Sequence, residues 1–271
     1  MGYISDTRGR GGEDRSGEGP LCHTKALTER PDSYPARAVV PPSKVSWRVD
    51  FPEYAPPEFT ALRVIAMDRT REPGNPALWA DPIDPGLVRG SLRSFEGELA
   101  FAGDRPLNPR GRTGISGRGE LGCWGPNHAA DPIVTRFNPQ TGALEAILIE
   151  RRDTGELAIP GGMCDRSDPH ISATLARELG EETGARVDFS QGTIVYRGYV
   201  DDRRNTDHAW METTVAHLHL TPDEALKITL AAGDDARPGS ARWVPLTAEV
   251  IARMYASHGD FLRQAIGSLR S

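Results

Sequence analysis

The chain has 271 residues, which is enough for one large or two modest domains with a real core. Hydrophobic residues make up 38% and charged residues 26%, as in globular proteins and unlike disordered chains. No apolar run approaches the roughly 20 residues that a membrane-spanning helix needs. The net charge of −6 argues against a general nucleic-acid or anionic-membrane surface. An anionic ligand would therefore need local cations, a metal or backbone amides.

The cysteines and the first residues bear on the compartment. Cys22, Cys123 and Cys164 form no C-x-x-C pair, which predicts free thiols in a reducing, cytoplasmic compartment. Residues 1–30 are rich in glycine and mixed charge, which predicts a disordered tail or linker. This tail lacks the apolar region of a signal peptide, and its acidic residues argue against a mitochondrial transit peptide.

Two domains are expected after the tail. Residues 31–128 are rich in proline and glycine, with strand-like pieces at Lys44–Asp50 and Phe59–Ala66, and predict an irregular N-terminal cap domain. Residues 129–271 interleave strands and helices, which predicts a layered α/β domain. Its expected strands are Ile133–Phe137, Ala143–Arg151, Leu157–Ile159, Thr193–Val200 and Ala209–Leu220, and its expected helices are about 169–183 and 248–269, the latter broken near Gly259.

The helix expected at about 169–183 has clear start and stop signals. Asp168 is a good N-cap, and Pro169 suits the first helical position. Gly184 fits the left-handed residue that follows a helix. Between them an apolar stripe recurs every four residues at Ile171, Leu175 and Leu179. The sequence therefore predicts an amphipathic helix with one buried face.

Three carboxylates on this helix are unusual. Glu178 and Glu182 fall within roughly 20° of the apolar stripe, and Glu181 lies beside them. Ionised groups at this spacing repel by roughly 3 kcal/mol per pair at an effective dielectric of 20. A divalent cation would reverse that repulsion, and an all-carboxylate set suits Mg²⁺ or Mn²⁺. A solvated acidic face with pairs such as Arg177–Glu181 is the alternative, and geometry alone leaves both open.

The segment 177–185, Arg-Glu-Leu-Gly-Glu-Glu-Thr-Gly-Ala, resembles the R-E-U-x-E-E-x-G-U half of the Nudix box, and Gly161-Gly162 is similar to its glycine start. The resemblance implies an α/β fold, the Nudix α/β/α sandwich with a mixed sheet. It also implies that Glu178, Glu181 and Glu182 ligate catalytic Mg²⁺, for which Mn²⁺ can substitute, and that Arg177 holds these carboxylates. One departure is that Asp168 replaces the family's first glutamate and that one extra residue precedes Arg177.

Three further stretches resemble the ADP-ribose pyrophosphatase branch of that family and the related domain of ADP-ribose-gated melastatin-type channels: 111–132, 199–212 and 255–258. The resemblance implies that ligand contacts come from Asp202, Arg204, Tyr255 and His258. The alternative is a charged turn and a helix surface. Arg112 and Arg118 would either reach the pyrophosphate or be loop arginines. His217 and His219 share one strand face, and we expect surface histidines rather than a metal pair.

The expected activity is Mg²⁺-dependent hydrolysis of the pyrophosphate of ADP-ribose to AMP and ribose 5-phosphate. Candidates for the general base are Asp202, Glu212, Asp234 and Asp235, and the sequence does not choose among them. The alternative from another class is an ADP-ribose-binding sensor within a larger channel polypeptide, with little or no hydrolysis. A Nudix enzyme for a different nucleotide is disfavoured by the flanking stretches. No nucleic-acid or membrane contact is expected.

Overall fold

The computed structural model describes residues 23–75, 77–152, 154–164, 170–231, 236–237 and 239–269. These residues form two compact units. The N-terminal unit contains residues 23–127 and 198–212, and the C-terminal unit contains 128–197 and 213–269. Residues 198–212, which belong to the expected Nudix domain by sequence, thus group with the N-terminal unit. Within the described ranges, no helix has the length and apolar character needed to span a bilayer.

The N-terminal unit is built mostly from loops that are tied together by buried polar groups. Its short helical elements are α1 (Lys25–Thr28), η1 (Pro42–Lys44), α2 (Leu62–Ala66), η2 (Pro85–Leu87) and η3 (Arg89–Ser91). Strands β1 (Glu58–Thr60) and β4 (Ser116–Gly119) pair in parallel, while β2 (Phe101–Ala102) and β3 (Arg105–Pro106) form an antiparallel pair. The expected irregular character of this region agrees with these short elements.

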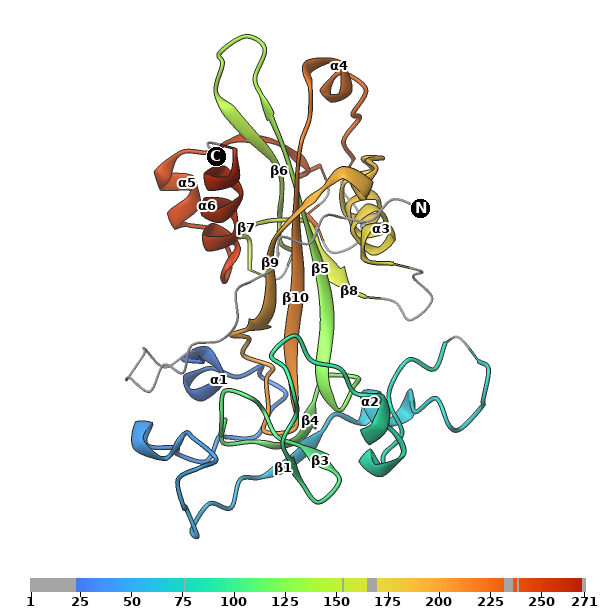
Figure 1. The fold of residues 1–271 in the computed structure, drawn as a ribbon, viewed down its shortest axis with the longest axis vertical. Coiled ribbons are helices and arrows are strands. Elements are labelled where there is room, and N and C mark those ends of the chain that lie inside the picture. The colour runs from blue at the N-terminus through green and yellow to red at the C-terminus, as the bar shows by residue number, and fades with distance from the viewer. Residues whose placement is uncertain are drawn as a thin grey trace. The chain divides into compact units, whose positions relative to one another are not determined.

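A mixed sheet organises the C-terminal unit, in the order β11-β6-β5-β10-β9, with β7 beside β6 and β8 beside β5 (Figure 1). Its strands are β5 (Gly125–Phe137), β6 (Leu144–Glu150), β7 (Leu157–Ala158), β8 (Gly162–Met163), β9 (Thr193–Val200), β10 (Ala209–His219) and β11 (Arg242–Pro245). Strand β5 is antiparallel to β6 and β8. It is parallel to β10, because Gly125 N donates to His208 O at one end and Leu220 N to Thr135 O at the other. The mixed sheet is as expected.

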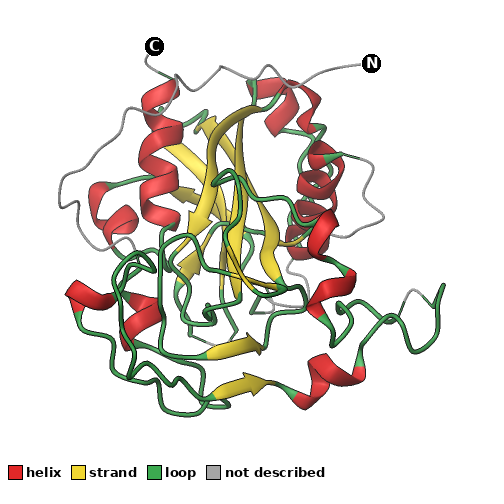
Figure 2. Cartoon of the chain, turned by 60° about the horizontal axis from the view of Figure 1, so that its bottom comes forward, coloured by secondary structure: helices red, strands yellow, loops and turns green. Residues whose placement is uncertain are grey.

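Two apolar cores cover the two faces of this sheet. On one face, α3 (Ile171–Thr183) packs Leu175 and Leu179 against Ala130 and Val134 of β5. On the other face, α5 (Ala248–Ala252) and α6 (His258–Ser268) pack against Ile133. Successive residues of a strand point to opposite faces, so β5 serves both cores. The helices flank the strands in Figures 1 and 2, and the α/β/α sandwich is confirmed. The remaining elements are η4 (Phe189–Gln191) and α4 (Pro222–Ala225).

Several expected boundaries are wrong. In the expected tail, residues 23–30 contain α1, whose Ala26 is fully buried. Residues 44–50 form a turn and bends instead of a strand, because their carbonyls accept from the Arg112 side chain rather than from a neighbouring strand. Residues 59–66 divide between β1 and α2. The expected break of the last helix near Gly259 is confirmed, at residues 253–257.

The ends of α3 show one further difference. Its N-cap is His170, whose ring nitrogen accepts from the amide of Ala173, so the helix begins at Ile171. Asp168 and Pro169, the expected start, lie outside the described residues. At the other end, Gly184 adopts φ 71° and its amide donates to Gly180 O, as expected for a helix C-terminus.

Candidate active site

The glycine pair 161–162 lies where β8 meets β5. Ala130 of β5 pairs with Gly162, so Asp131 continues the register opposite Gly161. A Cβ atom at Gly162 would overlap the carboxylate of Glu178, and one at Gly161 would overlap the carboxylate of Asp131. Glycine is therefore required at both positions by the close approach of acidic side chains. The Gly161–Gly162 backbone, called the glycine strip below, therefore lies between the carboxylates of Asp131 and Glu178.

Two of the three helix acids are buried against this glycine pair. Glu178 and Glu182 are only 6% and 7% exposed. The amide of Gly161 donates a 3.0 Å hydrogen bond to Oε2 of Glu182. Their burial on the apolar side of α3 is what the helical spacing predicts.

Arg177 joins two of the acids to the glycine loop. One of its Nη atoms lies 2.9 Å from Oε1 of Glu178 and 2.9 Å from Oε2 of Glu181. The other donates to the carbonyl of Met163 at 3.1 Å. Charge-assisted hydrogen bonds of this kind fix carboxylates in orientation. Glu181 itself is exposed and lines a cavity of about 500 Å³ beside α3, together with Arg177 and Arg186.

The donor set has the chemistry of a hard-cation site. Carboxylates at positions i, i+3 and i+4 of one helix, next to backbone carbonyls, are the oxygen ligands that Mg²⁺ and Mn²⁺ take. Among the described residues, no three His, Cys, Asp or Glu side chains are gathered closely enough to hold a metal in this conformation. Glu178 and Glu182, buried against the Gly161–Gly162 backbone, fit the group by their chemistry.

A fourth acid, which the sequence did not single out, contacts the same glycine pair. Asp131 accepts a 2.6 Å hydrogen bond from the hydroxyl of Thr213, which is buried in β10. Burial raises the pKa of Asp131 to about 6, and the Thr213 hydrogen bond partly offsets that rise. The only signal for this contact was the place of Asp131 in a stretch that resembled the family.

The expected ligand contacts fall in both units. In the N-terminal unit, Arg204 forms a two-pronged ion pair with Asp202, with contacts of 2.9 and 2.7 Å. Burial alone would raise the pKa of Asp202, but the charge and hydrogen bonds of Arg204 lower it. Asp202 is thus an ionised carboxylate with a fixed orientation.

Tyr255 and His258 lie at the start of α6 in the C-terminal unit. Nδ1 of His258 accepts from the amide of Ile159 at 2.9 Å, so this nitrogen carries no proton. The guanidinium of Arg151 lies 4.3 Å from the centre of the Tyr255 ring, and the two rings of Tyr255 and His258 meet edge to face. Tyr255 lies in the break between α5 and α6, and His258 is the first residue of α6.

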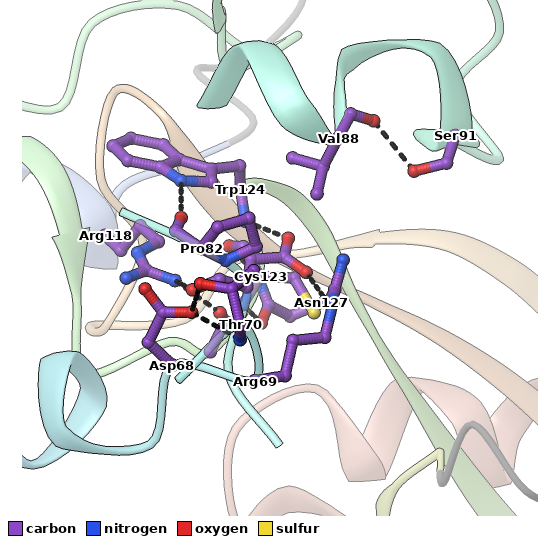
Figure 3. Close-up of polar contacts among 12 residues, drawn as sticks. Asp68, Arg69, Thr70, Pro82, Val88, Ser91, Arg118, Cys123, Trp124 and Asn127 are labelled. Atoms are coloured by element: carbon purple, nitrogen blue, oxygen red, sulfur yellow. Dashed lines mark hydrogen bonds and ion pairs between the residues drawn. The ribbon is translucent and has the colours of Figure 1, made fainter. Parts of the chain in front are cut away.

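Arg112 and Arg118 support the loop alternative. Arg118 is 1% exposed and donates to the carbonyls of Asp81 and Gly122, beneath the ring of Trp124. Figure 3 shows the surrounding network, in which Trp124 donates to the carbonyl of Pro82 and Thr70 donates to Asp68. Arg112 is 7% exposed and donates to three carbonyls between residues 44 and 49. Both arginines hold loops of the N-terminal unit together.

The structure excludes one of the four candidates for the general base, Glu212. Glu212 is fully buried and accepts from the hydroxyl of Ser94, the amide of Phe95 and the indole of Trp210. These bonds hold a loop and leave Glu212 no access to water. Asp234 and Asp235 lie outside the described residues.

The histidine pair is only partly as expected. His217 and His219 share one face, since both rings contact the hydroxyl of Thr135, at 2.7 and 2.8 Å. His217 is 5% exposed, so the expectation of a surface residue is wrong there. It packs beneath α6, where Ser268 approaches its other nitrogen.

Comparison with known proteins identifies the family. The model described as "NUDIX domain" matches residues 126–265, which is more than half of the chain. The chain belongs to the Nudix family. The model described as "NUDT9-like, N-terminal domain" matches residues 40–125 of this Nudix chain. Members of the family generally need a divalent metal.

Relatives are similar along most of the chain. The mitochondrial ADP-ribose pyrophosphatase of Rattus norvegicus is 40% identical over 89% of this chain and 77% of its own length. The transient receptor potential cation channel subfamily M member-like 2 of Nematostella vectensis is 36% identical over 90% of this chain, which spans 18% of that channel. A solved NUDIX domain of Shewanella oneidensis NrtR with ADP ribose is 20% identical, covers 53% of this chain and 88% of its own, and has a TM-score of 0.42.

Proposed function

We propose that this chain hydrolyses the pyrophosphate of ADP-ribose, giving AMP and ribose 5-phosphate. The observation that carries the proposal is the pair of buried acids, Glu178 and Glu182, set against the Gly161–Gly162 backbone. Similarity to a mitochondrial ADP-ribose pyrophosphatase over most of both chains supports ADP-ribose as the substrate. In the reaction, a water oxygen bonds to one phosphorus, and the bond from that phosphorus to the bridging oxygen breaks.

The three acids of α3 and Arg177 then each have a role. Glu178, Glu181 and Glu182 would hold Mg²⁺, for which Mn²⁺ can substitute. The cation would offset charge on the phosphate oxygens and lower the pKa of water. Arg177 orients Glu178 and Glu181 and ties them to the carbonyl of Met163. The amide of Gly161 fixes Glu182.

For substrate contacts we propose Asp202, Arg204, Tyr255 and His258. A carboxylate fixed by an arginine suits a ribose diol, and the proton on Nε2 of neutral His258 suits a phosphate or hydroxyl oxygen. Arg112 and Arg118 are left out, because their guanidinium groups already serve backbone carbonyls. The base remains open between Asp202, Asp234 and Asp235.

The second candidate is an ADP-ribose sensor within a larger channel polypeptide. The similarity to a channel over 90% of this chain favours it. Hydrolysis is favoured because the chain has all three helix acids and the arginine that orients them: Glu178, Glu181, Glu182 and Arg177. The compartment also stays a prediction: the sequence favours a reducing, cytoplasmic one, whereas the rat relative is named as mitochondrial.

The test combines turnover with binding. AMP released from ADP-ribose is measured by chromatography with Mg²⁺ and with EDTA, while a calorimetric titration measures ADP-ribose binding. We expect AMP only with the metal. Tight binding without AMP release would replace the hydrolase with the sensor, and neither binding nor release would reject ADP-ribose.

A further inference from the structure

Asp131 is an acid of the C-terminal unit that the proposed mechanism does not use. It follows Ala130 in β5 and belongs to the strand face of Ile133, whose core includes α5 and α6. It therefore reaches Gly161 from the face opposite α3. Its carboxylate lies so close to Gly161 that no side chain fits there.

The partners of this carboxylate are few. One oxygen accepts from the hydroxyl of Thr213. Throughout the ranges that the structure describes, no arginine, lysine or histidine forms an ion pair with Asp131. Asp131 is half-buried, and a carboxylate partly removed from water costs free energy unless a positive charge compensates it.

Gly161 connects Asp131 to the acids of α3. Its amide donates to Glu182 while its Cα lies against the carboxylate of Asp131. With standard backbone dimensions, Oδ1 of Asp131 and Oε2 of Glu182 are no more than about 8.5 Å apart. A cation held by Glu182 would thus act on Asp131 across the backbone of Gly161.

We propose that Asp131 is a positioning residue of the divalent-cation site: its negative charge, held by Thr213 against Gly161, strengthens cation binding by the helix acids without being one of their ligands. The inference rests on the proposed function, which places the cation at Glu178, Glu181 and Glu182. The charge of Asp131 is the required feature, and the contacts with Gly161 and Thr213 keep it close to the helix acids.

The test measures Mn²⁺ binding alone, by electron paramagnetic resonance titration of the full chain without substrate. Asp131→Asn keeps the size of the side chain and an oxygen acceptor for Thr213, and removes the charge. We expect its dissociation constant for Mn²⁺ to rise about three- to tenfold. Asp131→Ser, which also removes the charge, should give a rise of the same size.

Two controls separate charge from structure. Thr213→Val removes the hydrogen bond but keeps the charge, so its Mn²⁺ affinity should fall less than that of Asp131→Asn. Asp188→Asn makes the same chemical change at an exposed cap of the C-terminal unit and should bind Mn²⁺ like the unchanged protein. Equal losses in Thr213→Val and Asp131→Asn would reduce Asp131 to a structural role and overturn the proposal.

Glu182→Gln distinguishes failure of this inference from failure of the proposed function. If Glu182→Gln abolishes Mn²⁺ binding while both Asp131 variants bind within twofold of the unchanged protein, Asp131 has no part in the site. If Glu182→Gln binds Mn²⁺ normally, the cation site itself is misplaced, and the inference falls with it.

Discussion

The amide of Gly161 donates a 3.0 Å hydrogen bond to Oε2 of Glu182, which joins the glycine strip to the last acid of α3. Gly162, the next residue, lies against Glu178 one helical turn earlier. The strip and the helix therefore fix each other's position. A substitution in either should displace the carboxylates of Glu178 and Glu182 before it lowers the stability of the fold.

Replacement of Glu182 by glutamine should remove most turnover. The amide of Gly161 can still donate to the glutamine oxygen, so the fold should persist, but the charge that holds the cation is lost. We expect the rate of AMP release to fall at least about 100-fold, with a melting temperature close to that of the unchanged protein. Glu181→Gln should also be impaired, and full kcat in both variants would reject the metal assignment.

Gly162→Ala should impair catalysis more than stability. The new Cβ would overlap Glu178, whose flexible side chain must move away from its place beside Arg177. Gly180→Ala, in α3 between Glu178 and Glu181, is the matched control, because its nearest new contact is an ordinary one at 3.6 Å. It should raise the free energy of unfolding by about 0.5–1 kcal/mol and keep kcat. Similar activity in the two variants would contradict the proposed role of the glycine strip.

Arg118→Ala should destabilise the N-terminal unit. It would leave the carbonyls of Asp81 and Gly122 buried without their donor and uncover Trp124. The free energy of unfolding should fall by about 3 kcal/mol. Arg89→Ala, which removes an exposed arginine of the same unit, should cost less than about 1 kcal/mol. A variant that keeps its stability but has a raised KM for ADP-ribose would restore Arg118 as a ligand contact.

Acid should weaken the protein through His217. Burial lowers its pKa from 6.5 to about 4, with a smaller contribution from His219. As the pH falls below 6.5, the unfolded chain takes up the proton before the folded one, so stability is lost between pH 6.5 and about 4 and then levels off. The full loss is about 3 kcal/mol.

Urea unfolding at pH 7.5 and 5 measures the part of that loss that is complete by pH 5, about 2 kcal/mol. His217→Gln should lower stability at pH 7.5, because it disturbs the contact with Thr135, but it should reduce the difference between the two pH values. His219→Gln, at a more exposed position, should reduce it less. An unchanged pH difference in His217→Gln would show that other groups cause the acid sensitivity.

The chemistry-bearing helix was largely predictable from the sequence. Residues at i, i+3 and i+4 share a helical face whatever the rest of the chain does, so the burial of Glu178 and Glu182 followed from the place of Leu175 and Leu179. The N-cap was less predictable, since several residues before Ile171 can cap a helix and His170 does so. Short strands such as β8 carry too little periodicity to be recognised.

The N-terminal unit could not be predicted in the same way. Its loops depend on single polar contacts between distant residues, such as Arg112 with the carbonyls at 44–49, and local propensity contains no information about them. The contacts of Asp131 were not predicted for the same reason: its partners are Gly161, which precedes β8, and Thr213 of β10. From the sequence alone, an arginine that donates to backbone carbonyls cannot be told from one that binds a substrate.

Helix α1 has a practical consequence for anyone trimming this protein. Its first amides, from Lys25 and Ala26, donate to the carboxylate of Asp201, and His23 contacts the hydroxyl of Tyr199. The family match begins only at residue 40, so a recombinant fragment cut there would strip the cover from Asp201 and Tyr199. An expression boundary chosen ahead of His23 would preserve it, whereas one chosen from the family match would yield a weakened fragment whose poor behaviour could be mistaken for lack of activity.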